Sequence, residues 1–164
     1  MNQEDLKKLP QLNLPYAPMK MRLAGDAVQV FDPLRDKFVA LTPEEYVRQQ
    51  FTSYLINNLG YPPSLIANEI GLTFNDTKRR CDTVIFGRDK NAAVIVEYKA
   101  PDVTVTQNVF DQIVRYNTVL HAQYLVVSNG ICHFCCRMDY ERDTYHFIPT
   151  LPDYRALNFP SIDN

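Results

Sequence analysis

The chain has 164 residues and a formal net charge of −2, with 46% hydrophobic and 22% charged residues. This length suits one domain with one hydrophobic core, and the ordinary globular composition argues against disorder. The near-neutral charge does not support binding of nucleic acid through overall positive charge, although a local basic patch is compatible with it. The sequence has no run of 18 apolar residues and no apolar signal core near its start, so it predicts neither a membrane span nor secretion.

Cysteine usage indicates a reducing compartment. Cys132, Cys135 and Cys136 lie within five positions on one predicted strand, which is a poor disulfide framework. We therefore expect a cytoplasmic protein with reduced thiols. His133 in the same segment suggests a zinc or iron–sulfur site, but residues this close on one strand cannot all face one ion. Buried thiols on a core strand are the favoured interpretation.

The first part of the chain predicts an arm followed by a hairpin. Residues 1–26 contain Pro10, Pro15 and Pro18, a spacing that disfavours a regular helix and predicts an extended N-terminal arm. Residues 27–41 hold two short apolar runs around the turn sequence DPLRD, which predicts a hairpin.

The strongest helix signal begins at Thr42. Thr42 suits the N-cap and Pro43 suits the first helical position. Glu45, three residues after the N-cap, is predicted to complete a capping box. Gly60 marks the end of this helix.

Apolar periodicity predicts the remaining elements. In chain order they are a strand within 65–72, two strands within 81–100, a helix over 105–122, two strands around a turn at Asn129-Gly130, an edge strand over 144–149 and an irregular tail over 151–164. This order predicts an α/β domain over residues 27–150, with a mixed central β-sheet flanked by helices.

Three charged residues interrupt the apolar hairpin. Asp82 begins its first strand, while Glu97 and Lys99 end the second and share one face. A four-residue turn over 88–91 fixes which residues face each other across the strands, with side chains about 5 Å apart. The expected opposite pairs are Phe86 with Ala93, Val84 with Ile95, and Asp82 with Glu97.

Two adjacent carboxylates repel each other, so one binds a proton or a cation lies between them. Mg²⁺ suits such a pair, because it takes one or two carboxylates together with water and phosphate oxygens. An ammonium beside the ion can orient water or neutralise phosphate charge. Asp82, Glu97 and Lys99 thus match the needs of metal-dependent phosphodiester hydrolysis. The alternative is a solvated ion pair between Glu97 and Lys99, since strand ends often carry charges.

The following helix carries Gln112 and Tyr116 on one face. With the hairpin, they form the pattern D…EYK…QIVRY, which resembles the PD-(D/E)XK nucleases with a QxxxY motif. The blocks FDPLRDKFVALTPEEYVRQQFTSYLINNLGYP, EYKAP, FDQIVRYN and YLVVSNG are similar to the N-terminal nuclease domain of type I restriction enzyme R subunits, in a short stand-alone form. The resemblance covers roughly residues 28–150.

This resemblance implies a restriction-endonuclease-like fold and DNA cleavage that depends on Mg²⁺ or Mn²⁺. Asp82 and Glu97 would hold the metal, and Lys99 would assist the nucleophile. Gln112 and Tyr116 would support the site or contact the DNA.

Such families also place a glutamate of the first helix near the metal. We favour Glu44, which is in phase with Val47 and Phe51, because Glu45 is assigned to the helix cap. The basic residues just before the hairpin acid are expected to grip the DNA backbone, with a solvated strand entrance as the alternative. These residues are Lys78, Arg79 and Arg80.

DNA is therefore the expected partner, and the resemblance adds restriction–modification subunits. The chain is too short for the helicase motor of a full R subunit. Nucleases that cut both strands often form homodimers, but the sequence shows no interface pattern. Two other interpretations stay open: a non-catalytic module of the same fold that binds DNA or a partner, and a nuclease that acts on RNA.

Overall fold

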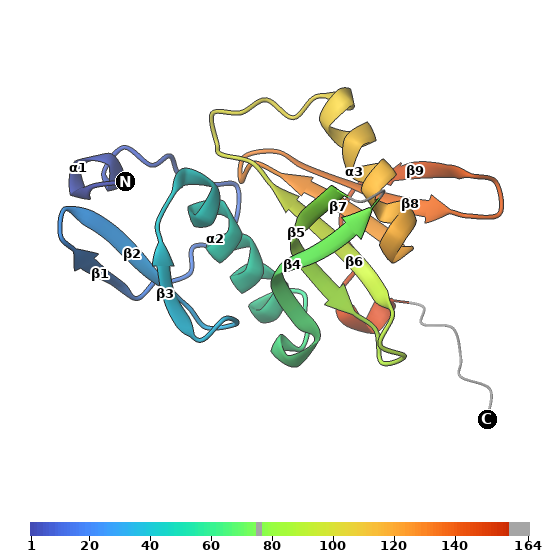
Figure 1. Ribbon diagram of the computed structural model, residues 1–164, viewed down its shortest axis with the longest axis horizontal. Coiled ribbons are helices and arrows are strands. Elements are labelled where there is room, and N and C mark those ends of the chain that lie inside the picture. Colours follow the sequence, from blue (N-terminus) through green and yellow to red (C-terminus); the bar gives the residue numbers. More distant parts are fainter. Residues whose placement is uncertain (75–76, 158–164) are drawn as a thin grey trace.

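The computed structural model describes residues 1–74 and 77–157, and its centre is a mixed six-stranded sheet (Figure 1). The strands lie in chain order: β4 (Ile66–Phe74), β5 (Thr77–Phe86), β6 (Ala92–Tyr98), β7 (Tyr124–Ser128), β8 (His133–Asp139) and β9 (Thr144–Ile148). Only the central pair β6–β7 is parallel, and the other neighbours are antiparallel. The predicted α/β class, a mixed sheet flanked by helices, is confirmed.

A second, three-stranded sheet precedes the main one. It contains β1 (Met21–Ala24), β2 (Ala27–Asp32) and β3 (Lys37–Ala40), so the predicted hairpin is confirmed and gains a third strand. The segment expected to form an extended arm also begins with a short helix, α1 (Gln3–Leu6). Gly25, at φ +62, provides the left-handed turn that folds β1 back onto β2.

Helix α2 (Pro43–Asn57) lies between the two sheets (Figure 1). Its start follows the prediction, because the Thr42 side chain accepts a hydrogen bond from the backbone N–H of Glu45 and Pro43 occupies the first turn. Val47, Phe51 and Leu55 are buried in a core that also contains Val94 and Val96 of β6. Burial of this apolar stripe fixes α2 against one face of the main sheet.

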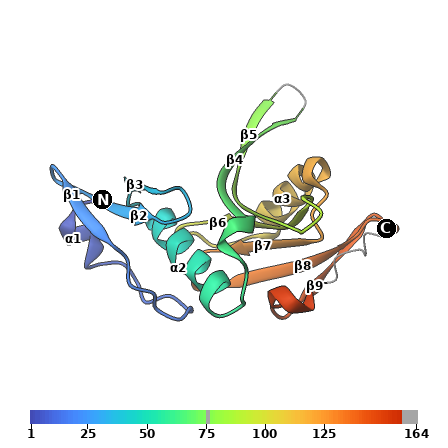
Figure 2. The same cartoon turned by 90° about the horizontal axis from the view of Figure 1, so that it is seen from below.

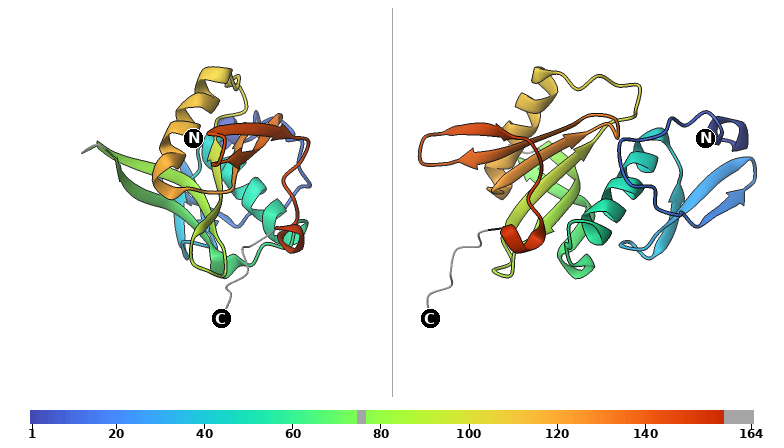
Figure 3. Two further views of the ribbon diagram at one scale, coloured as in Figure 1. Left: turned by 90° about the vertical axis from the view of Figure 1, so that its right-hand side faces the viewer. Right: turned by 180° about the vertical axis from the view of Figure 1, so that it is seen from behind.

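Helix α3 (Gln107–Leu120) connects the parallel strands β6 and β7 and covers the opposite face. Phe110 and Ile113 pack there with Leu125 and Val127 of β7. Strand β6 is thus buried on both faces, as its apolar sequence predicts. Seen from behind, the β8–β9 hairpin lies on the side of the main sheet away from β1–β3 (Figure 3).

Strands β4 and β5 form a long hairpin whose outer half curves away from the body of the protein (Figure 2). Residues 75–76 at its tip lie outside the described residues. The inner half of β5 pairs with β6, so this hairpin connects a projecting surface directly to the centre of the sheet.

The end of the chain packs more regularly than the sequence suggests. Leu151 and Leu157 are buried in the core that contains Val47 of α2 and Val94 of β6. A 3₁₀ turn, η2 (Tyr154–Ala156), lies between them. Residues 158–164 lie outside the described residues. Cys135 and Cys136 are buried as expected, but Cys132 is exposed. None of the helices within residues 1–74 and 77–157 is long and apolar enough to cross a membrane.

We expect Gly130→Ala to lower the free energy of unfolding by about 2 kcal/mol, as measured by urea denaturation. Gly130 has φ +83, and an added Cβ would lie 2.7 Å from Cδ2 of Leu12. Gly25→Ala is the matched control, because Gly25 has φ +62 but nothing within 4 Å of an added Cβ. Equal losses in the two variants would show that the contact with Leu12 contributes nothing.

Candidate functional site

The register of β5 and β6 brings the two predicted acids together. Thr83 pairs with Val96 and Val84 with Ile95, as the sequence analysis predicts for the second pair. The ladder ends there, and its next step would align Asp82 with Glu97. The prediction is wrong nearer the turn, where Phe86 pairs with Ala92 rather than Ala93 because a bulge follows Ile85.

Asp82 is buried, and hydrogen bonds hold both of its carboxylate oxygens. The backbone N–H of Tyr98 donates to Oδ2 at 2.8 Å, and Nη2 of Arg48 donates to Oδ1 at 3.1 Å. Burial raises the pKa of Asp82, while the bond from Tyr98 and the charge of Arg48 act in the opposite direction. The carboxylate is therefore fixed in place at the end of the β5–β6 ladder.

Among Asp82, Glu97 and Glu44, Glu97 has the most strongly shifted pKa. Burial, followed by the charges of Asp82 and Glu44, raises the pKa of Glu97 to about 8, and Lys99 opposes that rise. A hydrogen bond with the backbone of Asp82 also acts on the Glu97 carboxyl. Without an added cation, this site therefore holds a proton near neutral pH.

Glu44 lies close enough to interact with the same groups from the first turn of α2. Burial and then the charge of Asp82 raise the pKa of Glu44, whereas Lys99 and Arg48 lower it. The structure thus gathers four of the predicted residues, Asp82, Glu97, Lys99 and Glu44, into one electrostatic cluster.

The capping role assigned to the Glu45 side chain is wrong. Its backbone N–H bonds to Thr42, but its carboxylate accepts hydrogen bonds from Arg35, Arg48 and Gln49. A buried guanidinium three residues along the helix attracts the carboxylate more strongly than a solvated helix terminus does. Both glutamates of the first turn therefore face charged groups rather than the cap.

A chain of ion pairs joins this cluster to the small sheet, and the sequence analysis did not identify it. Arg35 contacts Asp32 of β2 and, at 2.5 Å, Glu45 of α2. Arg48 contacts Glu45 at 2.5 Å, Glu69 of β4 at 2.7 Å and Asp82 of β5 at 3.1 Å. The spacing of Arg48 from Glu45 on one helix face is a sequence signal for the first of these pairs. The contact with Glu69 had no such signal, because β4 is distant in sequence.

The two residues of the QxxxY motif have no described contact with this cluster. The side chain of Gln112 is exposed on α3, and no described hydrogen bond or ion pair links it to Asp82, Glu97 or Lys99. The side chain of Tyr116 lies outside the description. The motif therefore stays a prediction.

The predicted DNA-binding residues lie on β5, directly before the cluster. Lys78 is exposed, and exposed Arg80 pairs with Glu69 at 2.8 Å. The side chain of Arg79 lies outside the description. Lys78, Arg80 and Asp82 occupy alternate positions of the strand, so all three lie on one face, with the two cations next to the acid.

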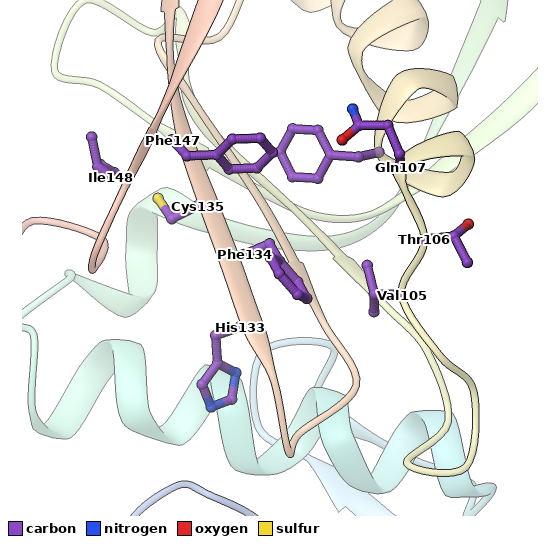
Figure 4. Close-up of a pocket in the computed structure, with 9 residues that line it drawn as sticks. Val105, Thr106, Gln107, His133, Phe134, Cys135, Phe147 and Ile148 are labelled. Atoms are coloured by element: carbon purple, nitrogen blue, oxygen red, sulfur yellow. The ribbon is translucent and has the colours of Figure 1, made fainter.

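A separate apolar pocket of about 410 Å³ lies between the start of α3 and the β8–β9 hairpin (Figure 4). Its lining residues are Val105, Thr106, Gln107, Phe110, His133, Phe134, Cys135, Phe147 and Ile148. No carboxylate lines it, so its chemistry differs from that of the acid cluster. Across residues 1–74 and 77–157, no three His, Cys, Asp or Glu side chains are arranged to hold a metal by themselves.

We expect metal-free protein to lose stability as pH rises from about 4.5 to about 8, the ordinary and folded pKa values of Glu97. Between these values the folded state binds the extra proton, so a rising pH favours unfolding. Glu97→Gln removes this titration, and its melting temperature in EDTA should exceed that of wild type more at pH 9 than at pH 5. Glu141→Gln, in an exposed turn, is the control. A difference in melting temperature that does not change with pH would contradict the shifted pKa.

Two comparisons relate the chain to known proteins, and a third, against curated proteins, gives no match. Residues 43–152 match the family described as type I restriction enzyme R protein N terminus. The fold is similar to a fragment described as an HsdR subunit of a type I restriction enzyme from Vibrio vulnificus YJ016, with 18% identity and a TM-score of 0.50. That similarity covers 71% of this chain and 24% of the other, so the matched part of this chain spans about a quarter of the solved fragment. Because the family model spans most of the chain, the protein belongs to the family of type I restriction enzyme R protein N-terminal regions.

Proposed function

We propose that this protein is a divalent-metal-dependent endonuclease that hydrolyses DNA phosphodiester bonds. The observation that carries the proposal is that Asp82, Glu97 and Lys99 interact electrostatically at the end of the central strand β6. Membership of a restriction-enzyme family supports DNA as the substrate and restriction subunits as partners.

The donor chemistry and the charge of the site fit a divalent ion. Mg²⁺ typically takes only one or two protein carboxylates and completes its shell with water and phosphate oxygens, so a three-ligand protein cage is not required. The linked charges comprise six carboxylates, Asp32, Glu44, Glu45, Glu69, Asp82 and Glu97, and four cations, Arg35, Arg48, Arg80 and Lys99. When all are ionised, two negative charges are in excess, which one Mg²⁺ or Mn²⁺ balances.

In this proposal Asp82 and Glu97 hold the ion, with Glu44 nearby on α2. A bound ion of this kind supplies water of lowered pKa and neutralises phosphate charge. Glu97 must release its proton before it can act as a ligand, because only the carboxylate binds metal. Lys99 donates hydrogen bonds to the attacking water or to the phosphate oxygens.

The basic strand β5 brings DNA to these acids. Exposed Lys78 and Arg80 are in phase with Asp82 on the projecting hairpin, so phosphates bound there lie along the path to the site (Figure 2). Backbone contacts of this kind orient a duplex without reading its sequence. A homodimer, which would place two such sites on opposite strands, is part of the proposal for double-strand cleavage.

The direct test is cleavage of plasmid, linear DNA and RNA with Mg²⁺, with Mn²⁺ or with EDTA. We expect DNA cleavage only with metal, and a loss of about 100-fold or more in Asp82→Asn, Glu97→Gln and Lys99→Ala. Lys90→Asn, in the turn between β5 and β6, is the matched control, because Asn tolerates the left-handed backbone of Lys90.

Other outcomes of these assays would change the substrate class, support a non-catalytic function or reject the assigned site. Cleavage of RNA alone would move the substrate class from DNA to RNA. DNA binding without cleavage, together with no Mn²⁺ binding by calorimetry, would support the non-catalytic module instead. Activity that is unchanged in Glu97→Gln or Lys99→Ala would reject the assigned site.

Lys78→Ala should weaken DNA binding about equally for unrelated sequences and should reduce the salt dependence of log Kd by about 1. The reason is that an exposed lysine which neutralises one phosphate releases about one counterion. Fluorescence anisotropy with labelled duplexes, at salt concentrations from about 50 to about 200 mM, measures this salt dependence. An unchanged salt slope would remove Lys78 from the DNA contact.

A further inference from the structure

We infer that Arg48 and Glu69 are positioning residues of the proposed active site. Glu69 holds the guanidinium of Arg48, and Arg48 in turn aims the carboxylate of Asp82. This inference rests on the proposed nuclease function, but its geometric part concerns the arrangement of three side chains and can be tested without activity.

The first observation is that Arg48 joins three elements at one point. Its side chain is 4% exposed, and its terminal nitrogens contact Glu45 of α2, Glu69 of β4 and Asp82 of β5. Nη2 alone contacts both Glu69, at 2.7 Å, and Asp82, at 3.1 Å. The position of the Arg48 guanidinium therefore depends on Glu69, and Oδ1 of Asp82 is oriented by that same nitrogen.

The second observation is that the environment of Arg48 is not optimised for stability. Its Nε is buried and has no hydrogen-bond partner among the described residues. Buried ion pairs in general contribute little net stability, and apolar residues can replace them without loss. A buried arginine with an unpaired nitrogen therefore calls for an explanation other than stability, and contact with a proposed metal ligand provides one.

The third observation is the backbone of Glu69. Glu69 has φ +60 inside β4, a conformation that is unfavourable for any residue with a Cβ. Its neighbours pair regularly, Asn68 with Thr83 and Ile70 with Cys81, so the interruption lies directly opposite Asp82. Local strain of this kind tends to occur at functional sites. Here it accompanies a carboxylate that bonds to Arg48 through Oε1 and to Arg80 through Oε2.

The contacts of Arg48 also join α2 to the main sheet, so Glu69 and Arg48 could act only as structural residues. The test must separate a structural role from a positioning role. Glu69→Gly does so, because glycine adopts the left-handed conformation freely and relieves the strain. If Glu69 only stabilised the fold, its removal would lower the melting temperature and leave the chemistry of the folded protein unchanged. If Glu69 positions Arg48, cleavage and Mn²⁺ affinity of the folded protein fall, whether or not the melting temperature changes.

We expect Glu69→Gly to reduce metal-dependent DNA cleavage and Mn²⁺ affinity by about 10-fold or more, the usual effect of losing a residue that orients a ligand. Asp143→Gly is the matched control, because exposed Asp143 has φ +50 in the β8–β9 turn and loses the same charge and the same strain. Glu69→Gly with cleavage and Mn²⁺ affinity within twofold of Asp143→Gly would overturn the proposal.

A second variant and a crystal structure complete the test. Arg48→Lys keeps the buried charge, so it should fold where removal of the charge would not, but a single ammonium cannot reproduce the contacts of the guanidinium. We expect at least a 10-fold loss of cleavage from Arg48→Lys at an unchanged DNA affinity. Wild-type activity in this variant would overturn the role of Arg48.

Crystal structures of wild type and Glu69→Gly report on the geometry without any activity. We expect the wild-type crystal to keep Arg48 between Glu69 and Asp82, and the variant to show the Asp82 carboxylate rotated or in two orientations. An unchanged Asp82 would overturn the proposal, whatever the cleavage result. An inactive wild-type protein with the expected crystal geometry would instead reject the nuclease function and leave the positioning pair in place.

Discussion

The guanidinium of Arg48 is the contact on which the arrangement of the acid cluster depends. It contacts Asp82 at the point where helix α2, strand β4 and strand β5 meet. Removing one partner from a buried ion pair costs about 3–5 kcal/mol, because the remaining charge is left in a poorly solvating environment. Arg48 therefore permits several carboxylates to be buried close together, which the apolar core on either side would otherwise disfavour.

The end of the β5–β6 ladder explains why the acids lie where they do. Beyond the pair of Thr83 and Val96 the regular pairing of β5 with β6 ends, and the backbone N–H of Tyr98 needs another acceptor. Oδ2 of Asp82 fills that role, so the aspartate side chain continues the ladder by one bond. Glu97 and Lys99 are partly exposed to solvent at the end of a strand that is otherwise buried. The acid cluster thus lies where regular pairing stops.

Sequence reasoning succeeded where neighbours along the chain determine the outcome. The cap at Thr42 and the pairing of Val84 with Ile95 follow from local spacing. It failed where distant segments compete for one group, as when Arg48 draws Glu45 away from the helix cap. Glu69 could not be identified at all, because its role requires both the register of β4 with β5 and an unfavourable backbone angle that nothing in a Glu side chain predicts.

The excess of negative charge links the protonation of Glu97 to the cation binding that we propose. In the absence of metal, Glu97 lowers the repulsion from Asp82 and Glu44 by keeping a proton up to about pH 8. In the function we propose, a divalent ion held there would remove the same repulsion more completely, because it would attract every carboxylate around it, and it would displace that proton. In that proposal, a proton and a metal ion are alternative ways to neutralise one cluster of acids. The balance between them would depend on how strongly Arg48 already neutralises Asp82, so the ion pairs of Arg48 would influence the proposed chemistry as well as the fold.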